Sequence, residues 1–402
     1  MEAIASDLPE GETAMNSRER ALRALRHQQG RAPDRIPMYV TMVSEVAEVL
    51  SQVTGIAPYN CDAYLTNRIS HAEILTSLGN DVVGIGSTAP DSSPTRTRPD
   101  GLRVDEWGLV YRQVPHGFGV YQEVVERPLS GITSAQELAG YAMPDPGAVG
   151  RFDVASDHSQ RYGRDYALLG VIECTVFEMA WNLVGLEQFL TDMALRKDYV
   201  GALLDMVADY SISVGLELIH LGAEIMLTGD DLGMDIGPMI SPKMWREQIK
   251  PRLQRVLDAY RAAKPDIILA YHTCGSVLPL IDELMEIGVD VLNPIQVTAN
   301  GMDPAALKRE YGDRLAFLGG IDQRHVLPEG TPQEVDLEVR SRMWQMGQGG
   351  GYMVAPTHDI QADTPVENVL RLFQSVKQWG QYPLKPAMYA SGVDPPGAIP
   401  SA

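Results

Sequence analysis

The chain contains few cysteines and no long apolar run. Three cysteines, Cys61, Cys174 and Cys274, stand among 402 residues. Three thiols cannot all pair, and their spacing matches no disulfide framework, so we expect a reducing compartment. No apolar stretch reaches the roughly 20 residues of a membrane helix. The segment from Met1 to Ala14 lacks the basic start and apolar core of a signal peptide. These absences predict a soluble, cytoplasmic protein.

Clusters of basic residues are also missing. The chain has 53 Asp and Glu against 33 Lys and Arg, which gives a formal net charge of -20. An acidic chain without a Lys/Arg patch is a poor ligand for phosphate backbones, so we expect no nucleic-acid partner. With 45% hydrophobic and 21% charged residues, the composition is that of an ordinary globular protein.

Short apolar runs alternate with helical patterns along most of the chain. No Gly-X-Gly-X-X-Gly follows the first run, which argues against a dinucleotide-binding fold. Eight β/α units predict a (β/α)8 TIM barrel rather than an open doubly wound sheet. The eight predicted strands are Ile36–Val40, Asp81–Gly86, Ala167–Ile172, Glu224–Thr228, Ile267–His272, Val289–Asn293, Leu315–Gly320 and Tyr352–Pro356.

The remaining segments set the domain organisation. We expect a disordered N-terminal extension at 1–15, one barrel domain at 16–382 and a C-terminal tail at 383–402. Between the second and third strands, residues 90–129 alternate apolar and polar side chains and carry turn signals such as Asp100-Gly101. This segment predicts a β-hairpin excursion over the mouth or side of the barrel.

The fifth predicted strand ends in Tyr271-His272-Thr273-Cys274-Gly275. Residues two apart in a strand point to the same face, so His272 and Cys274 would both face the carboxyl-terminal mouth of a barrel. An imidazole beside a thiol suits a soft divalent metal, with zinc first. The alternative is a buried His and a buried Cys with no ligand. His358 ends the eighth strand and would complete a three-ligand site with one open position, or would instead hydrogen-bond substrate or Asp359.

Other polar residues end strands at the same mouth. Carboxylates that could complete the coordination or donate a proton are Asp231, Glu173 and Asp322. Residues placed to bind substrate are Asp230, Asn293, Gln296 and Tyr271. Each group has a structural alternative: Glu173 could cap the next helix, Asp230 and Asp231 could suit a Gly-rich turn, and Asn293 could bond loop backbone.

Several motifs resemble the uroporphyrinogen decarboxylase superfamily. They lie in Asn16-Ser-Arg-Glu-Arg-Ala-Leu-Arg-Ala-Leu-Arg-His27, Pro33-Asp-Arg-Ile-Pro-Met38, His272-Thr-Cys-Gly275, Leu318-Gly-Gly-Ile-Asp322, and Ala355-Pro-Thr-His-Asp-Ile-Gln361 leading into Thr364-Pro-Val-Glu-Asn368. The similarity runs from about residue 16 to 380 and implies a (β/α)8 barrel, in agreement with the strand count.

This superfamily implies two chemistries. Its decarboxylases bind a tetrapyrrole with eight carboxylates through an arginine-bearing motif, but Met38 to Thr66 contains no Arg or Lys. Its corrinoid-linked methyltransferases hold zinc with a His-X-Cys pair and a later Cys. His272 and Cys274 match that pair, whereas Thr357-His358 stands where the later Cys belongs. His358 instead resembles the substrate-contacting His of the decarboxylases.

We therefore expect a zinc-dependent methyltransferase, or demethylase, that moves a methyl group between a small methylated substrate and a corrinoid carrier or thiol. The corrinoid would come from a partner protein. The alternatives are a decarboxylase or lyase for a smaller acid, with Asp231 as general acid, and a non-catalytic corrinoid- or metabolite-binding protein. The excursion at 90–129 could shape specificity or form a subunit contact, and in the second case we expect a homodimer.

Overall fold

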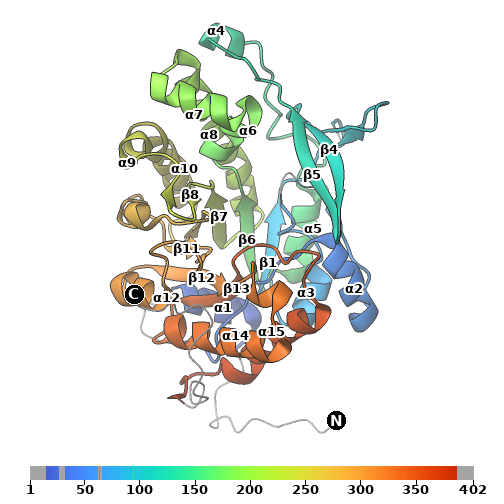
Figure 1. The fold of residues 1–402 in the computed structure, drawn as a ribbon, viewed down its shortest axis with the longest axis vertical. Coiled ribbons are helices and arrows are strands. Elements are labelled where there is room, and N and C mark those ends of the chain that lie inside the picture. The colour runs from blue at the N-terminus through green and yellow to red at the C-terminus, as the bar shows by residue number, and fades with distance from the viewer. Residues whose placement is uncertain (1–14, 27–31, 62, 64–65, 94, 387–402) are drawn as a thin grey trace.

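A curled, parallel sheet of seven strands forms the centre of the molecule (Figure 1). The computed structural model describes residues 15–26, 32–61, 63, 66–93 and 95–386. In spatial order, the strands are β1 (Val82–Gly86), β6 (Ala167–Ile172), β7 (Ile225–Gly229), β10 (Ile268–His272), β11 (Val291–Asn293), β12 (Ala316–Ile321) and β13 (Tyr352–Pro356). They coincide with seven of the eight predicted strands. All seven are fully buried, as expected for apolar runs in a parallel sheet covered by helices.

The remaining predicted strand, Ile36–Val40, which is the first along the chain, does not form a regular strand. The segment makes single parallel bridges to β13 and beyond it, between Met38 and Val354 and between Met42 and Ile360. On its other side, the Asp81 N–H donates to the Met38 carbonyl at 2.9 Å. The segment therefore occupies the gap between β13 and β1, although few of its hydrogen bonds follow a ladder.

Helices pack around the sheet, and several begin where the sequence indicates. Asn16 caps the first helix by accepting the Glu19 N–H, and Thr331 with Glu334 forms a complete capping box. The helices of four residues or more are α1 (Ser17–Leu25), α2 (Ser44–Thr54), α3 (Ala72–Leu78), α4 (Ala135–Leu138), α5 (Asp153–Tyr162), α6 (Phe177–Val184), α7 (Leu186–Leu195), α8 (Asp198–His220), η2 (Trp245–Ile249), α10 (Lys250–Ala263), α11 (Ile281–Glu286), α12 (Pro304–Tyr311), α13 (Val326–Glu329), α14 (Pro332–Gly347) and α15 (Val366–Trp379). Within the described ranges, no helix is both long and apolar enough to cross a membrane.

The core divides according to the two faces of the strands. Alternate positions of the parallel strands contribute to one compact cluster, because side chains in a strand alternate between faces. Tyr39 of the irregular segment joins this cluster, so the segment closes the same inner face. The strand residues in it are Val82, Ala167, Leu169, Val171, Ile225, Leu227, Ile268, Ala270, Val291, Ala316, Leu318, Met353 and Ala355. The opposite positions pack with the helices in a larger cluster.

A second sheet stands apart from the parallel strands. Its antiparallel order is β2 (Arg96–Thr97), β3 (Arg103–Val104), β4 (Val110–His116) and β5 (Gly119–Glu126). Figure 1 shows β4 and β5 projecting to one side of the parallel sheet. We call residues 90–129 the excursion. A short pair, β8 (Gly233–Met234) and β9 (Gly237–Pro238), follows β7.

A buried carboxylate holds the irregular segment to the start of β1. Asp81 is fully buried, and its oxygens accept from Arg20 at 2.7 Å, from Arg35 at 2.9 Å and from the Met38 N–H at 3.0 Å. A buried charge is tolerated only when paired and hydrogen-bonded in this way.

Removing this carboxylate should destabilise the fold strongly. We expect Asp81→Ala to lower the free energy of unfolding by about 3–5 kcal/mol, since the Arg35 guanidinium loses its carboxylate partner and the buried Arg20 keeps only Asp34. Asp34→Ala is the matched control, because Asp34 also pairs with Arg20 but is partly exposed, and exposed pairs contribute about 0–1 kcal/mol. Denaturant unfolding measures both, and equal losses would contradict this account.

Candidate functional site

Three possible metal ligands meet where β7 and β10 end. They are Asp231, His272 and Cys274, whose ligand atoms all lie within 4.8 Å of one another. His272 Nε2 is 3.5 Å from Cys274 Sγ and 3.7 Å from an Asp231 carboxylate oxygen. Nitrogen, sulfur and oxygen donors of these types form catalytic zinc sites. We call these three residues the ligand group.

The strand register explains why these residues meet. His272 lies opposite Gly229 in the pairing of β10 with β7, and Cys274 and Asp231 each follow two residues later. The Cys274 N–H donates to Asp231 Oδ1 at 2.9 Å, which joins the two strand ends. A Cβ on Gly229 would lie 2.7 Å from that of His272. Glycine at 229 therefore permits the close approach.

Asn293 at the end of β11 orients the imidazole. Its amide nitrogen donates to the Leu318 carbonyl at 3.0 Å, so its Oδ1 faces His272 Nδ1 at 2.7 Å. Nδ1 therefore carries the proton, and Nε2 keeps its lone pair toward Cys274 and Asp231. Arg68 Nη2 also lies 3.2 Å from Nδ1. A guanidinium has no acceptor and Nδ1–H has no free lone pair, so this contact is electrostatic rather than a hydrogen bond.

The electrostatics of the group suit a bound cation. Burial, and then the charge of Arg68, lower the pKa of His272, which keeps the imidazole in its neutral, metal-binding form. Burial, and then the charge of Asp231, raise the pKa of the Cys274 thiol well above its usual value. A divalent cation reverses that balance by stabilising the thiolate. The three side chains fit a divalent metal by donor type and proximity, and Asn293 holds the imidazole in the orientation that binding needs.

His358, the third ligand expected from the sequence, lies beside this group. Its ring centroid is 6.3 Å from that of His272, with the rings at 73°, and its side chain is exposed. Among the described residues, the possible metal ligands whose ligand atoms lie within 4.8 Å of one another are those of the ligand group, which includes Asp231 and not His358. The geometry therefore favours Asp231 as the third donor and leaves His358 next to the open side of the group.

Asp230 and Tyr271, expected to bind substrate, lie in the interior. Asp230 accepts the N–H groups of Val176 at 3.0 Å and Glu178 at 2.8 Å, and so anchors the start of α6. The Tyr271 hydroxyl donates to the other Asp230 oxygen at 3.3 Å. Burial raises the pKa of Asp230 to about 7. Both residues hold the strand ends that carry the ligand group.

Gln296 and Asp322 also support backbone in this structure. Gln296 accepts the Gly275 N–H at 2.8 Å and donates to Asp235 at 3.1 Å, which fixes the turn after Cys274. Asp322 accepts the Arg324 N–H at 2.8 Å and the His325 N–H at 3.2 Å, directly before α13. Both contacts position loops at the carboxyl ends of the strands.

Two charged residues at the site were not predicted from the sequence. Arg68 is buried and donates to Glu173 at 2.6 Å. Glu178 accepts the Asp231 N–H at 3.0 Å, and burial followed by the charge of Asp231 raises its pKa to about 8. Neither residue ends a strand. The available signal for Glu178 was its place in the first turn of the helix after β6.

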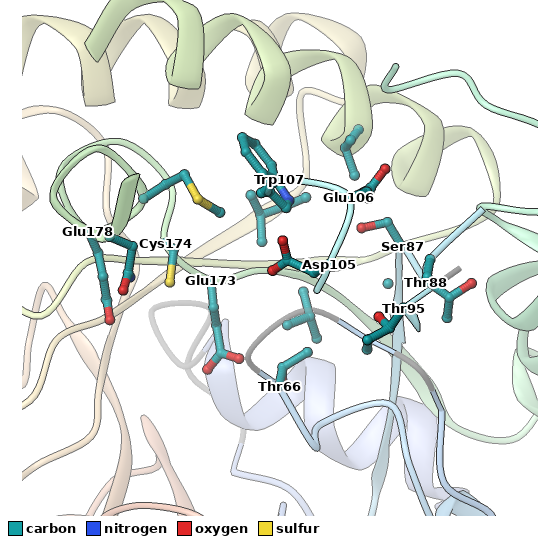
Figure 2. A pocket seen from close by; sticks show the side chains of 18 of the residues that line it. Thr66, Ser87, Thr88, Thr95, Asp105, Glu106, Trp107, Glu173, Cys174 and Glu178 are labelled. Atoms are coloured by element: carbon teal, nitrogen blue, oxygen red, sulfur yellow. The ribbon is translucent and has the colours of Figure 1, made fainter. Parts of the chain in front are cut away.

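A cavity of about 670 Å³ adjoins the ligand group. Glu178 lines it and also bonds Asp231, so the cavity and the group share a wall. Figure 2 shows Asp105 and Trp107 entering from the excursion, and Glu173 and Cys174 from the end of β6. Both α6 and α8 contribute further lining residues. The cavity therefore lies between the excursion and the barrel.

A family comparison supports the resemblance seen in the motifs. The family described as uroporphyrinogen decarboxylase (URO-D) matches residues 127–379, more than half of the chain. The chain belongs to the uroporphyrinogen decarboxylase family. The match includes β6 to β13 and hence all three residues of the ligand group.

Known members of the family with similar sequences include both chemistries. A methylated-thiol–coenzyme M methyltransferase of Methanosarcina mazei is 24% identical over 50% of this chain and 51% of its own length. The methylcobamide:CoM methyltransferase MtbA of the same organism is 21% identical over 64% and 71%. A uroporphyrinogen decarboxylase of Coxiella burnetii is 23% identical over 48% and 51%. The chain thus spans about half the length of the first and third relatives.

One solved structure shares the fold over nearly the whole chain. A methyltransferase from Methanosarcina mazei superposes with a TM-score of 0.66 at 21% identity, covering 90% of this chain and 99% of that one. The predicted resemblance to the methyltransferase branch is confirmed. The predicted α/β architecture with a curled parallel sheet is confirmed as well.

The excursion carboxylate Asp105 gives the folded protein a specific pH dependence. Burial raises its pKa to about 6. A raised carboxyl pKa contributes stability below the unfolded value near 4, and this contribution is lost as the pH rises through 6. We expect Asp105→Asn, which mimics the neutral form, to gain on the order of 1–3 kcal/mol relative to wild type between pH 4 and pH 7.

Denaturant unfolding at the two pH values measures this gain. Glu123→Gln on β5 is the matched control, because its side chain is exposed and its pair with Arg112 is 3.9 Å long. It should change stability little at either pH. A pH-independent difference between Asp105→Asn and wild type would contradict the assignment.

Proposed function

We propose that this protein is a zinc-dependent methyltransferase that moves a methyl group between a small methylated substrate and a thiol or a corrinoid carrier. Asp231, His272 and Cys274 would hold the zinc, and the adjoining cavity would hold the substrate. The observation that carries the proposal is the ligand group itself, with His272 Nε2 at 3.5 Å from Cys274 Sγ and 3.7 Å from Asp231. The corrinoid would be carried by a partner protein.

The protein side chains have distinct tasks in this scheme. A bound zinc would lower the pKa of a thiol or polarise a heteroatom. Asn293 keeps the proton on His272 Nδ1, and Gln296 fixes the turn that carries Cys274. His358, exposed beside His272, is placed to contact a substrate at the open position. Glu178 and Glu173 place carboxyl groups at the shared wall, where a departing group could take a proton.

The charge of the cavity argues against uroporphyrinogen decarboxylation. Its described lining contains four carboxylates and one basic side chain, Arg103. A substrate with eight carboxylates needs several cations to bind. A smaller acid, as in the decarboxylase alternative, would meet the same repulsion from Asp105.

Metal analysis of purified variants tests the ligand group. We expect wild type to bind about one zinc per chain. His272→Ala, Cys274→Ala and Asp231→Ala should each bind zinc at least about 100-fold more weakly, since a three-ligand site loses most of its affinity when one donor is removed. Methyl transfer to a thiol should fall in parallel.

Two controls sharpen this test. Cys61→Ala removes a buried thiol outside the ligand group and should retain zinc. His358→Ala should retain zinc within about 10-fold while activity falls, if Asp231 is the third ligand. Full zinc binding by Cys274→Ala, or full activity of metal-free protein, would contradict the proposal. Zinc loss in His358→Ala together with retention in Asp231→Ala would instead make His358 the ligand.

Asn293 should tune the affinity without touching the metal. We expect Asn293→Ala to weaken zinc binding about 10- to 100-fold, because His272 loses the acceptor that fixes its ring and its proton. Asn293→Asp keeps that acceptor and should restore most of the affinity. Competition with a chromogenic chelator measures both variants. Asn300→Ala, an exposed residue on the loop after β11, is the control, and equal affinities for all four proteins would refute the orienting role.

A further inference from the structure

The cavity beside the ligand group contains carboxylates that lack a positive partner. Glu106 pairs with Arg151 through two contacts of 2.6 Å, and Glu173 pairs with Arg68 at 2.6 Å. Asp105 and Glu178 also line the cavity, and neither has a cationic partner within the described part of the chain.

The contacts of these two carboxylates come from neutral donors. Asp105 accepts the Tyr111 hydroxyl at 2.7 Å and the Leu109 N–H at 3.0 Å. Glu178 accepts the Asp231 N–H at 3.0 Å. Both side chains are half-buried, and a carboxylate that is partly shielded from water is costly unless a positive charge accompanies it. Asp105, which lies on the cavity wall of the excursion, is therefore matched electrostatically to a positively charged ligand.

Aromatic side chains form another part of the cavity lining. Trp107 and Tyr210 stand edge to face, with centroids 4.7 Å apart at 70°, and Trp181, Tyr111 and Tyr121 line the same cavity. Figure 2 shows the Trp107 indole close to the Asp105 carboxylate. Arg151 lies over the Tyr210 ring at 5.9 Å and so already occupies one aromatic face. Tryptophan and tyrosine faces beside a carboxylate are the surroundings that recognise quaternary ammonium groups.

Arg103 is the one basic residue among the described lining residues. It lies on β3, two residues before Asp105, and both residues line the cavity. Its charge would repel an ammonium group placed beside it, as would that of Arg151 at the Tyr210 ring, so the ammonium group would lie against Trp107 rather than Tyr210. A methylated amine with a carboxylate arm could use both ends of this wall.

We propose that the cavity binds a small methylated ammonium compound, with Asp105 as its counter-charge and Trp107 as its aromatic contact. The proposal rests on the proposed function, because it names the class of methyl donor that this enzyme would use. Transfer from such a donor to a thiolate breaks the C–N bond and forms a C–S bond. The C–N electron pair stays on nitrogen, so a neutral amine leaves and neither oxidant nor reductant is needed.

Calorimetric titration of the full chain at pH 8 with two matched probes tests the site. Choline carries a trimethylammonium group, and 3,3-dimethylbutan-1-ol has the same shape without the charge. We expect choline to bind at least about 10-fold more tightly, since cation–π and counter-charge contacts act on the charged probe alone. Equal affinities for the two probes, or no binding of choline, would overturn the proposal.

Variants assign the selectivity to the named residues. Asp105→Asn should weaken choline binding about 10-fold or more and leave the affinity for dimethylbutanol unchanged. Trp107→Leu should weaken choline binding about 3- to 30-fold. Glu123→Gln is the matched control, because it removes a carboxylate from the same sheet at a position outside the cavity lining. Choline affinity unchanged in Asp105→Asn would overturn the proposal. If Trp107→Leu fails to fold, Trp181→Leu takes its place.

This outcome is separable from that of the proposed function. Choline selectivity in a protein that binds no zinc and transfers no methyl group would sink the proposed function and leave the ammonium site intact. Zinc binding and methyl transfer from neutral donors, without selectivity for choline, would sustain the proposed function and overturn the ammonium site.

Discussion

The buried carboxylate of Asp81 is the contact that fixes the irregular segment at Met38 beside the start of β1. It joins two guanidinium groups and the Met38 N–H, and thereby holds an irregular segment where a regular strand would otherwise stand. Further along that segment, the Thr41 hydroxyl donates to the buried Asp359 carboxylate after β13. Asn67 donates to the same carboxylate at 3.0 Å. These side-chain contacts add to the backbone hydrogen bonds that join the segment to Val354 and Ile360.

Two kinds of polar contact surround the ligand group. Some hold its side chains in place, and others determine the charge of the residues around it. Asn293, Gln296, Asp230 and Tyr271 position the ends of β7 and β10. Arg68 contributes charge, and it balances Glu173 while keeping His272 neutral. A buried polar network of this kind is stable because nearly every member has a partner. The residues expected to bind substrate mostly belong to the first class, which makes them supports for the site.

Seven strands were predictable because buried parallel strands are continuous apolar runs, and such runs are visible in the sequence. Ile36–Val40 has the same composition, yet two of its N–H groups donate to the side chains of Asp81 and Asn80, which periodicity cannot reveal. Strand alternation placed His272 and Cys274 on one face. Asp231 was among the carboxylates expected to complete the coordination, but its place beside Cys274 depends on the contact between the Cys274 N–H and the Asp231 carboxylate, which the sequence does not reveal. Arg68 and Glu178 lie off the strand ends, and the tertiary fold alone brings them to the site.

Asp105 and Trp107 lie on the turn that joins β3 to β4, and the sheet of β2 to β5 shares no strand with the parallel sheet. The ligand group, by contrast, is built on strands whose hydrogen bonds hold the barrel together. Selection could therefore alter one wall of the cavity by substitutions in the excursion, with little effect on the strands that carry His272 and Cys274. A division of this kind would let related chains diverge in what the cavity accepts while retaining the same ligand group.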